Sequence, residues 1–566
     1  MRLPLARADD GSIPDPPREQ TGVRSRRLQF RAGLLGVCLL ALFMGAVGIT
    51  NEGYVSLHGD PARHLMNGVY FLDLARDRPF ATVSDFVEYT RLYYARYPAL
   101  GLGHLPLLLP IVEAPVFAIF GVSILAARLV VLLSAIAATA YLYLLVSELY
   151  GVRAGVFAAA FMATSPLLVV LTRSIMSEMP TVALLVASAY YLHRFCTTER
   201  RGPLAAFVLT LVLSLYAKQL AIFVFPAFLG VALVELGIKR LLKRDVLLAV
   251  SAIAFFSMPV IPLTLVMSPA NVEFVRVRTR VHYSFLSSII DAILPQLSVA
   301  VLLLAAAGLA MAVVKRDRRV VLFVLWVGGV FAGLLIAGVL SPARYTIYWV
   351  PALSALAAST VVRARGAAAS RVVMVVLLLA LGFQTWTAAQ QRLVGAIGYE
   401  EAARFVIESD PGPTVLFSGD IDTGYFSFFV RKHDPARRLV VLRSDKVLTT
   451  SKLGRPSVED RIDRPEEIYR VLHTFGTRYV VIEDRPSRSR VLEWLRQELR
   501  SPRFVERRRI PIGTSDIRMP DTSLVVYEFV DRTAPDQDAV LDMHLPIIGQ
   551  SVSVKLSDLI TRKYLR

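Results

Sequence analysis

A succession of long apolar blocks occupies the chain from residue 32 to residue 390 and then stops. A helix needs about 20 apolar residues to cross the roughly 30 Å of hydrocarbon in a bilayer, and many of these blocks reach that length. The composition agrees, since 55% of the 566 residues are hydrophobic and only 19% are charged. Such a chain is too apolar for an ordinary soluble protein and too poor in charge to stay disordered. The sequence therefore predicts a polytopic α-helical membrane protein.

Eleven of the blocks are candidate transmembrane helices. They lie near residues 32–50, 124–148, 154–172, 179–196, 203–217, 219–236, 246–267, 290–314, 320–340, 345–362 and 371–390. A further apolar segment, 105–120, is short and contains three prolines and Glu113. If this segment does not cross the membrane, every Lys and Arg cluster between the spans falls on one side, as cytoplasmic loops require. We therefore expect about eleven spans, with 105–120 as a re-entrant or interfacial helix.

The distribution of charged and apolar residues also predicts the orientation of the chain in the membrane and its division into three regions. Residues 1–31 are polar and rich in Arg and Pro, so we expect a disordered cytoplasmic N-terminus followed by a span that is kept as an anchor. Residues 32–390 form the predicted transmembrane domain, which includes a long external loop at 51–123. Within this loop, the pattern at 62–76 suits a helix that lies along the membrane surface. Residues 391–566 then face the external, periplasmic side of a cell inner (cytoplasmic) membrane.

The basic residues and the cysteines exclude two other classes of site. A net charge of +18 could indicate a nucleic-acid partner, but the Lys and Arg residues cluster between the apolar blocks, where they orient helices. We therefore expect membrane lipids as partners and no nucleic acid. Cys38 and Cys196 both lie inside apolar segments and supply neither a disulfide framework nor a zinc site.

From Tyr399 onward the apolar blocks give way to alternating helix and strand signals, typical of a small soluble α/β domain. Helices are expected at 399–409, 464–475 and 488–499, and strands at 414–418, 439–442, 478–483 and 522–530. No Gly-rich phosphate loop is present in this region.

Ordered motifs between residues 55 and 235 resemble the GT-C superfamily of membrane glycosyltransferases. The run 58–68 (HGDPARHLMNG) follows the first span, where those enzymes carry their catalytic acid. Three further motifs are similar to protein O-mannosyltransferases and aminoarabinose-type lipid transferases: Tyr97-Pro98-Ala99-Leu100, Phe120-Gly121 with Ala127-Arg128-Leu129, and Arg173 to Pro180. The resemblance implies an inverting hexosyl or pentosyl transferase that takes a sugar from a polyprenyl-phosphate donor. It also implies a lipid, glycan or protein acceptor at the outer face of the membrane.

Two acids are the candidate catalytic residues. Transfer of a glycosyl group from a lipid phosphate to a hydroxyl needs a base for the acceptor proton, and Asp60 or Glu178 can supply it. Each also has a structural interpretation, because Asp60 precedes Pro61 and Glu178 precedes Pro180, and acids at such helix starts cap the helix or favour its dipole. Together the acids could hold a divalent cation, so a metal stays open although no cofactor is certain.

Positive charge for the departing phosphate is the second requirement of this chemistry. Arg344, Lys218 and Tyr345 are the candidate donor-phosphate site, because Arg grips phosphate bidentately and charges in such apolar surroundings face a polar cavity or the interface. The alternative is that Lys218 and Arg344 only extend to the lipid headgroups. His282 lies in the external loop 268–290 among three arginines, a basic set that indicates an anionic partner. The lesser candidates are His104, Glu88, His282 and Arg63.

Two other functions compete with this interpretation. The chain could be a secondary transporter, but it has no repeated halves, and its notable charges gather in external loops instead of broken helices. It could also be a non-catalytic membrane protein of cell-envelope assembly, although a single span would suffice to anchor the C-terminal region.

Overall fold

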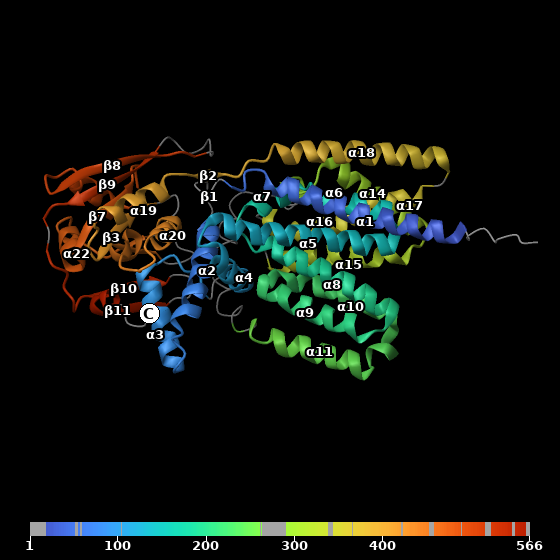
Figure 1. Cartoon of the computed structure of the whole chain (residues 1–566), viewed down its shortest axis with the longest axis horizontal. Helices are drawn as coiled ribbons and strands as arrows, with labels where there is room; N and C mark the ends of the chain where they lie inside the picture. The colour runs from blue at the N-terminus through green and yellow to red at the C-terminus, as the bar shows by residue number, and fades with distance from the viewer. Residues whose placement is uncertain are drawn as a thin grey trace, which may run out of the picture.

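The computed structural model of the protein describes residues 18–50, 55–56, 59–102, 105–260, 262, 290–291, 293–337, 343–364, 366–419, 423–451, 458–487, 489–514, 522–531, 533–545 and 550–561. Most of these residues are helical. The long helices run side by side in a bundle, and a small sheet with its own helices lies beyond one end of that bundle (Figure 1).

Six helical runs in the described residues are long and apolar enough to cross a membrane. They are Ser25–Ala46 within α1 (Arg18–Ala46), α5 (Ile124–Tyr150), Gln219–Leu241 across η1 and α10, Arg318–Ala337 across η2 and α15, Ala343–Arg363, and α18 (Ala367–Ala389). The shorter apolar helices are α4 (Leu108–Phe120), α9 (Arg201–Ala217) and α14 (Val299–Val314). The described part of the chain is therefore a multi-pass helical bundle, and the total of eleven spans stays a prediction.

The span expected at 154–172 is broken. Helices α6 (Val152–Ala163) and α7 (Pro166–Arg173) together pass the length and composition test, but they are bent by 61° to each other. Pro166 has no N–H to continue a helix and favours the first position of a new one. The Ser165 hydroxyl oxygen accepts from the Leu168 N–H, and its O–H donates to the Gln296 carbonyl at 2.6 Å. The break is thus held by a neighbouring segment.

Helices α2 (Gly59–Asp77) and α4 lie between the bundle and the sheet, and α3 (Val83–Arg96) packs against the sheet region (Figure 1). The helix expected along the membrane surface at 62–76 is α2, but the structure packs it on both sides, against α4 and against α20 (Thr423–His433). Its buried face includes Ala62, Leu65, Met66 and Val69. Helix α4 has 13 residues and is about 20 Å long, too short to cross the bilayer.

The sheet has five strands in the order β4-β3-β7-β9-β8. They are β3 (Thr414–Ser418), β4 (Val440–Arg443), β7 (Thr477–Glu483), β8 (Phe504–Ile512) and β9 (Thr522–Phe529). Strand β3 pairs in parallel with β4 and β7, whereas β9 pairs antiparallel with β7 and β8. The helices expected here are α19 (Tyr399–Glu408), α22 (Glu467–Phe475) and α23 (Arg490–Glu498), each within three residues of its expected bounds.

Several elements of this region were not expected from the sequence, among them α20, β8 and the hairpin of β10 (Val540–Leu545) and β11 (Gln550–Lys555). Strand β8 reads FVERRRIPI and lies at the sheet edge, where charged side chains discourage pairing with another chain. Its arginines bind acids of neighbouring elements, Arg507 to Glu528 at 2.6 Å and Arg508 to Glu401 at 2.7 Å. A strand with this sequence lacks the alternating apolar pattern that identifies strands.

A two-residue ladder joins the two chain segments that leave the bundle. Strand β1 (Val55–Ser56), which follows α1, pairs antiparallel with β2 (Gly395–Ala396), which follows α18. The start of α2 is therefore fixed close to the connection between the bundle and the sheet.

Candidate functional site

The first turn of α2 presents Asp60 to two arginines. Arg344 Nη1 donates to Asp60 Oδ2 at 2.8 Å, and Arg63 Nη1 lies 3.4 Å from Oδ1. Arg63 is one turn along α2, whereas Arg344 comes from the short helix η3 (Ala343–Tyr345) between α15 (Val321–Ala337) and α16 (Val350–Ala358). The Asp60 side chain keeps 21% of its surface exposed, so the carboxylate is accessible to a bound molecule.

Opposing effects act on the ionisation of Asp60. Burial alone would raise the pKa of this carboxyl, but the positive charges of Arg344 and Arg63 and the hydrogen bond from Arg344 outweigh it. The net result is a pKa well below the usual range of an aspartate. Asp60 is therefore ionised in the structure as it stands.

Glu178 and Lys218 form a second acid and base pair. Glu178 begins α8 (Glu178–Thr198), and Lys218 caps the C-terminal end of α9 before η1 (Gln219–Val224). Lys218 Nζ donates to Glu178 Oε1 at 2.5 Å, and the glutamate side chain is fully buried. A carboxylate at the start of a helix is favoured by the helix dipole, and the lysine supplies the remaining countercharge.

The ring of Tyr345 connects the two pairs. Its centroid lies 5.3 Å from Lys218 Nζ and 5.3 Å from the guanidinium carbon of Arg344, distances at which cations are attracted to an aromatic face. Arg344 also interacts electrostatically with both Asp60 and Glu178. The five main sequence candidates, drawn from α2, α8, the α9–η1 junction and η3, therefore form one cluster.

This cluster contains the groups that a sugar transfer from a phosphate requires. Asp60 is an ionised, partly exposed carboxylate, and Arg344 and Lys218 place two positive charges within 5.3 Å of the centre of one tyrosine ring. A divalent cation fits these residues poorly, because each acid is already bound by a cationic side chain. Among the described residues no group of three His, Cys, Asp or Glu side chains could hold a metal ion.

The lesser candidates fall in different places. Arg63 belongs to the cluster through its contact with Asp60. Glu88 lies on α3 and pairs with Arg91 at 3.1 Å; Arg91 in turn donates to the carbonyl of Ser553 in β11. Glu88 therefore belongs to the contact between α3 and the C-terminal hairpin. His104 and His282 lie outside the described residues.

Glu113 of α4 is a buried acid that was not among the sequence candidates for the site. Glu113 of α4 is fully buried, and neither of its carboxyl oxygens has a hydrogen-bond partner. Burial raises its pKa to about 8. Its carboxyl packs on Gly68 of α2, where a Cβ atom would come within 2.7 Å of Glu113 Oε2. The only sequence signal was an acid in a short, proline-rich apolar segment.

Two arginines of the family-like motifs prove to bind backbone. Arg128 Nη1 donates to the Ile49 carbonyl at 3.1 Å, and Arg173 Nη2 donates to the Met44 carbonyl at 2.8 Å. Both carbonyls belong to the C-terminal end of the first span, so these arginines hold that end against α5 and α7.

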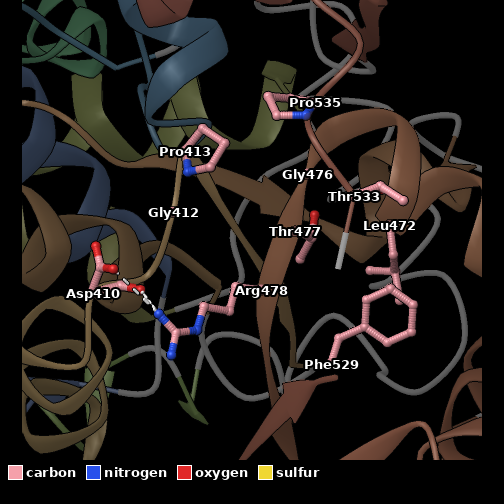
Figure 2. A pocket seen from close by; sticks show the side chains of 10 residues that line it. All are labelled: Asp410, Gly412, Pro413, Leu472, Gly476, Thr477, Arg478, Phe529, Thr533 and Pro535. Atoms are coloured by element: carbon pink, nitrogen blue, oxygen red, sulfur yellow. Dashed lines mark hydrogen bonds and ion pairs between the residues drawn. The ribbon is translucent and has the colours of Figure 1, made fainter. Parts of the chain in front are cut away.

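A cavity of about 180 Å³ lies among residues of the C-terminal sheet region. Figure 2 shows its lining residues, which are Asp410, Gly412, Pro413, Leu472, Gly476, Thr477, Arg478, Phe529, Thr533 and Pro535. Its one cation, Arg478, is already bound by Asp410 at 3.5 Å and by Glu528 at 3.0 Å. The cluster around Asp60 is the better candidate site, because it combines a partly exposed carboxylate with two cations beside one aromatic ring, whereas the cavity has a single cation.

Comparison with known protein families gives one match. Residues 104–262 match the model of the dolichyl-phosphate-mannose-protein mannosyltransferase family. This segment contains Glu178 and Lys218, whereas Asp60 and Arg344 lie on either side of it. No curated protein sequence matches the chain.

Solved structures match the fold over most of the chain. ArnT from Cupriavidus metallidurans, solved with bound undecaprenyl phosphate, shares 13% identity at a TM-score of 0.52 and covers 90% of this chain and 99% of its own. The oligosaccharyltransferase AglB from Archaeoglobus fulgidus, in complex with an inhibitory peptide and a dolichol-phosphate, shares 14% identity at a TM-score of 0.51 and covers 80% of this chain and 69% of its own. At sequence identities of 13% and 14%, the comparison shows a shared fold.

Proposed function

We propose that this chain, which the family match and the shared fold support as a membrane glycosyltransferase of the GT-C superfamily, transfers a sugar from a polyprenyl-phosphate donor to an acceptor hydroxyl at the cluster around Asp60. The acceptor is a lipid, glycan or protein. Transfer takes place at the outer face of the cytoplasmic membrane, with the C-terminal α/β region on the same side. The fold neighbours support the donor class, since one was solved with undecaprenyl phosphate and another with a dolichol-phosphate.

The observation that carries this proposal is the 2.8 Å contact between Asp60 and Arg344 beside the Lys218–Glu178 pair. The contact joins the candidate base, Asp60, directly to Arg344, the candidate cation for the donor phosphate. Burying a charge in an apolar bundle costs free energy. A protein that served only as a membrane anchor would gain nothing from two charged pairs placed close together.

In the proposed reaction, Asp60 acts on the acceptor, and Arg344 and Lys218 act on the carrier phosphate. The carboxylate of Asp60 accepts the proton of the acceptor hydroxyl as the acceptor oxygen attacks the anomeric carbon of the sugar. The bond between that carbon and the carrier phosphate oxygen breaks, and its electron pair stays on the phosphate. Arg344 and Lys218 stabilise the negative charge that develops there. Attack opposite the leaving phosphate inverts the anomeric centre.

The decisive experiment incubates purified protein with a panel of radiolabelled polyprenyl-phosphate sugars and a membrane-lipid and glycan acceptor mixture. We expect carrier-dependent transfer of one sugar class. The matched negative control is the double variant Asp60→Asn/Arg344→Gln, which removes both charges of the pair together. Arg63 then loses its contact with Asp60, but its side chain is 36% exposed and can be solvated. The positive control is Asp245→Asn, at an exposed pair with Arg201 remote from the cluster.

Transfer by wild type and by Asp245→Asn, but not by the double variant, supports the proposal. Transfer by all three proteins places the reaction elsewhere in the chain. A wild-type protein that transfers no sugar from any member of the panel, in the presence of all acceptors, rejects the glycosyltransferase assignment.

A further inference from the structure

Helix α2 carries Asp60 in its first turn and two buried aspartates near its other end. Asp73 and Asp77 are 13 and 17 positions beyond Asp60, about 20 and 26 Å along a continuous helix. A helix of this length moves as one body, so whatever fixes its C-terminal half also fixes the direction in which Asp60 points. In Figure 1, α2 lies between the bundle and the sheet.

Each of these aspartates is bound by an arginine of the sheet region in bidentate geometry. Arg431 of α20 donates to Asp73 from Nε at 2.8 Å and from Nη2 at 2.6 Å. Arg437, in the turn after α20, donates to Asp77 from Nη1 at 2.5 Å and from Nη2 at 2.8 Å. Two parallel hydrogen bonds fix the relative orientation of the partners as well as their distance.

Tyrosines of α3 complete both pairs. The Tyr93 hydroxyl donates to Asp73 Oδ2 at 2.7 Å, and the Tyr89 hydroxyl donates to Asp77 Oδ2 at 2.8 Å. Both aspartate side chains are at most 1% exposed, and those of Arg431 and Arg437 are 4% and 7% exposed. The network is therefore dry and satisfied, unlike the partly exposed pair at Asp60.

Apolar packing could join two helices without the cost of burying four charges. Replacing a buried ion pair by well-packed apolar residues is often neutral or stabilising, so such pairs are weak evidence for stability alone. The buried ion pairs fix the relative orientation of the two segments that they join, since a bidentate pair tolerates little rotation or sliding. Two of them, one turn apart on α2, fix the rotation of that helix about its own axis.

We propose that Arg431 and Arg437 are positioning residues, through which the C-terminal α/β region sets the orientation of α2 and so the place of Asp60 relative to Arg344. The region is thus part of the active-site scaffold. This inference rests on the proposed function for the role of Asp60, but the placement of α2 that it describes does not depend on that role.

The test variant is Arg431→Lys, which keeps the positive charge in the buried site but loses the planar bidentate contact. The matched control is Arg363→Lys. Arg363 is equally buried and donates to Asp317 at 2.7 Å, but it lies in α17 (Thr360–Arg363), at the end of the bundle away from the sheet (Figure 1). Both variants are full-length proteins in the same detergent, with thermal unfolding measured in parallel.

Two readouts separate positioning from general damage. The first is the kcat and donor KM of sugar transfer: we expect Arg431→Lys to lower kcat about tenfold to a hundredfold with little change in KM, since misplacing a group by an ångström costs this much. We expect Arg363→Lys to retain wild-type kcat. Equal kcat in wild type and Arg431→Lys, or an equal loss in both variants, overturns the proposal.

The second readout needs no activity. Spin labels at Gly59→Cys, at the start of α2, and Leu133→Cys, on the exposed side of α5, report the distance between α2 and the bundle in a background with Cys38 and Cys196 replaced by Ala. We expect one narrow distance distribution in the parent and in Arg363→Lys, and a shifted or broadened one in Arg431→Lys. An unchanged distribution in Arg431→Lys overturns the positioning role even if the sugar transfer itself is never observed.

Discussion

Arg344 Nη1 donates a 2.8 Å hydrogen bond to Asp60 Oδ2, although 284 positions separate the two residues. In this arrangement the candidate phosphate-binding cation is occupied by the candidate base, and the pKa of Asp60 is held low. In the proposed reaction, a donor phosphate competes for Arg344 through the same charge-assisted contacts. If Arg344 turns to the phosphate, Asp60 loses its main countercharge and its basicity should rise. We therefore expect donor binding to activate the base.

Replacement of Arg344 tests this link. We expect Arg344→Ala to weaken donor use more than Arg344→Lys, because Lys loses the bidentate geometry while Ala loses the charge as well. The measurement is kcat/KM for the donor with each variant at equal protein amounts. Wild-type kcat/KM in the Ala variant would remove Arg344 from the site.

The Glu178–Lys218 pair makes a prediction about stability. Glu178→Gln leaves the largely buried Lys218 without its countercharge, and breaking a buried pair from one side costs about 3 kcal/mol or more. The double variant Glu178→Gln/Lys218→Met removes both charges and should recover much of that loss while sugar transfer stays impaired. Thermal unfolding in detergent distinguishes the two. If the single variant unfolds at the wild-type temperature, the pair is not a structural element.

The members of the cluster could be found in the sequence through two different signals. Asp60 and Glu178 lie in motifs that resemble the GT-C superfamily, whereas Lys218, Arg344 and Tyr345 interrupt apolar sequence. Their contacts could not be found, because the approach of α2 to η3 depends on how the whole bundle packs. Sequence patterns indicate which face of a single helix or strand is buried. They carry little information on contacts between residues that lie hundreds of positions apart in the chain.

The network at Asp73 was missed for the opposite reason. Asp73 and Arg431 lie in segments that read as ordinary charged stretches, and 358 positions separate them. Charged residues are usually solvated, so only the packing of α20 on α2 makes them a buried pair. The break between α6 and α7 was missed because Ser165-Pro166 lies inside an apolar run of normal span length. The Ser-Pro pair favours the start of a new helix, but the length and hydrophobicity of the whole segment predicted one continuous span.

Glu113 makes the protein's stability depend on pH. Its pKa, raised to about 8 by burial, lies above the value of about 4.3 for an exposed glutamate, so the folded state holds a proton that the unfolded state releases. Stability should therefore fall as pH rises from about 4.5 to 8 and level off above that range. Glu113→Gln should remove this slope. The check is the thermal unfolding midpoint between pH 5.5 and 8.5, and parallel curves for both proteins would contradict the assignment.

The membrane orientation predicts which residues a reagent can reach. Ser84 in α3 is exposed and belongs to the loop expected outside, whereas Lys243 is exposed and belongs to a basic cluster expected in the cytoplasm. In intact spheroplasts, an impermeant thiol reagent should label Ser84→Cys and spare Lys243→Cys until the cells are opened. The reverse labelling pattern would invert the topology.

Asp60→Asn separates the catalytic role of this residue from a role in starting α2. Asn is about as good as Asp at a helix N-terminus, so a purely structural Asp60 predicts little loss of stability or activity in the variant. An amide cannot accept the acceptor proton, and loss of a positioned base typically costs on the order of 10²–10⁴ in rate. The freed Arg344 side chain is 27% exposed and can be solvated, so a folded, membrane-inserted protein is expected. The measurement is turnover of detergent-purified protein beside Asp245→Asn, with thermal unfolding in parallel. Turnover within about threefold of wild type, less than about 1 kcal/mol of barrier, would return Asp60 to a structural role and leave Glu178 as the next candidate base.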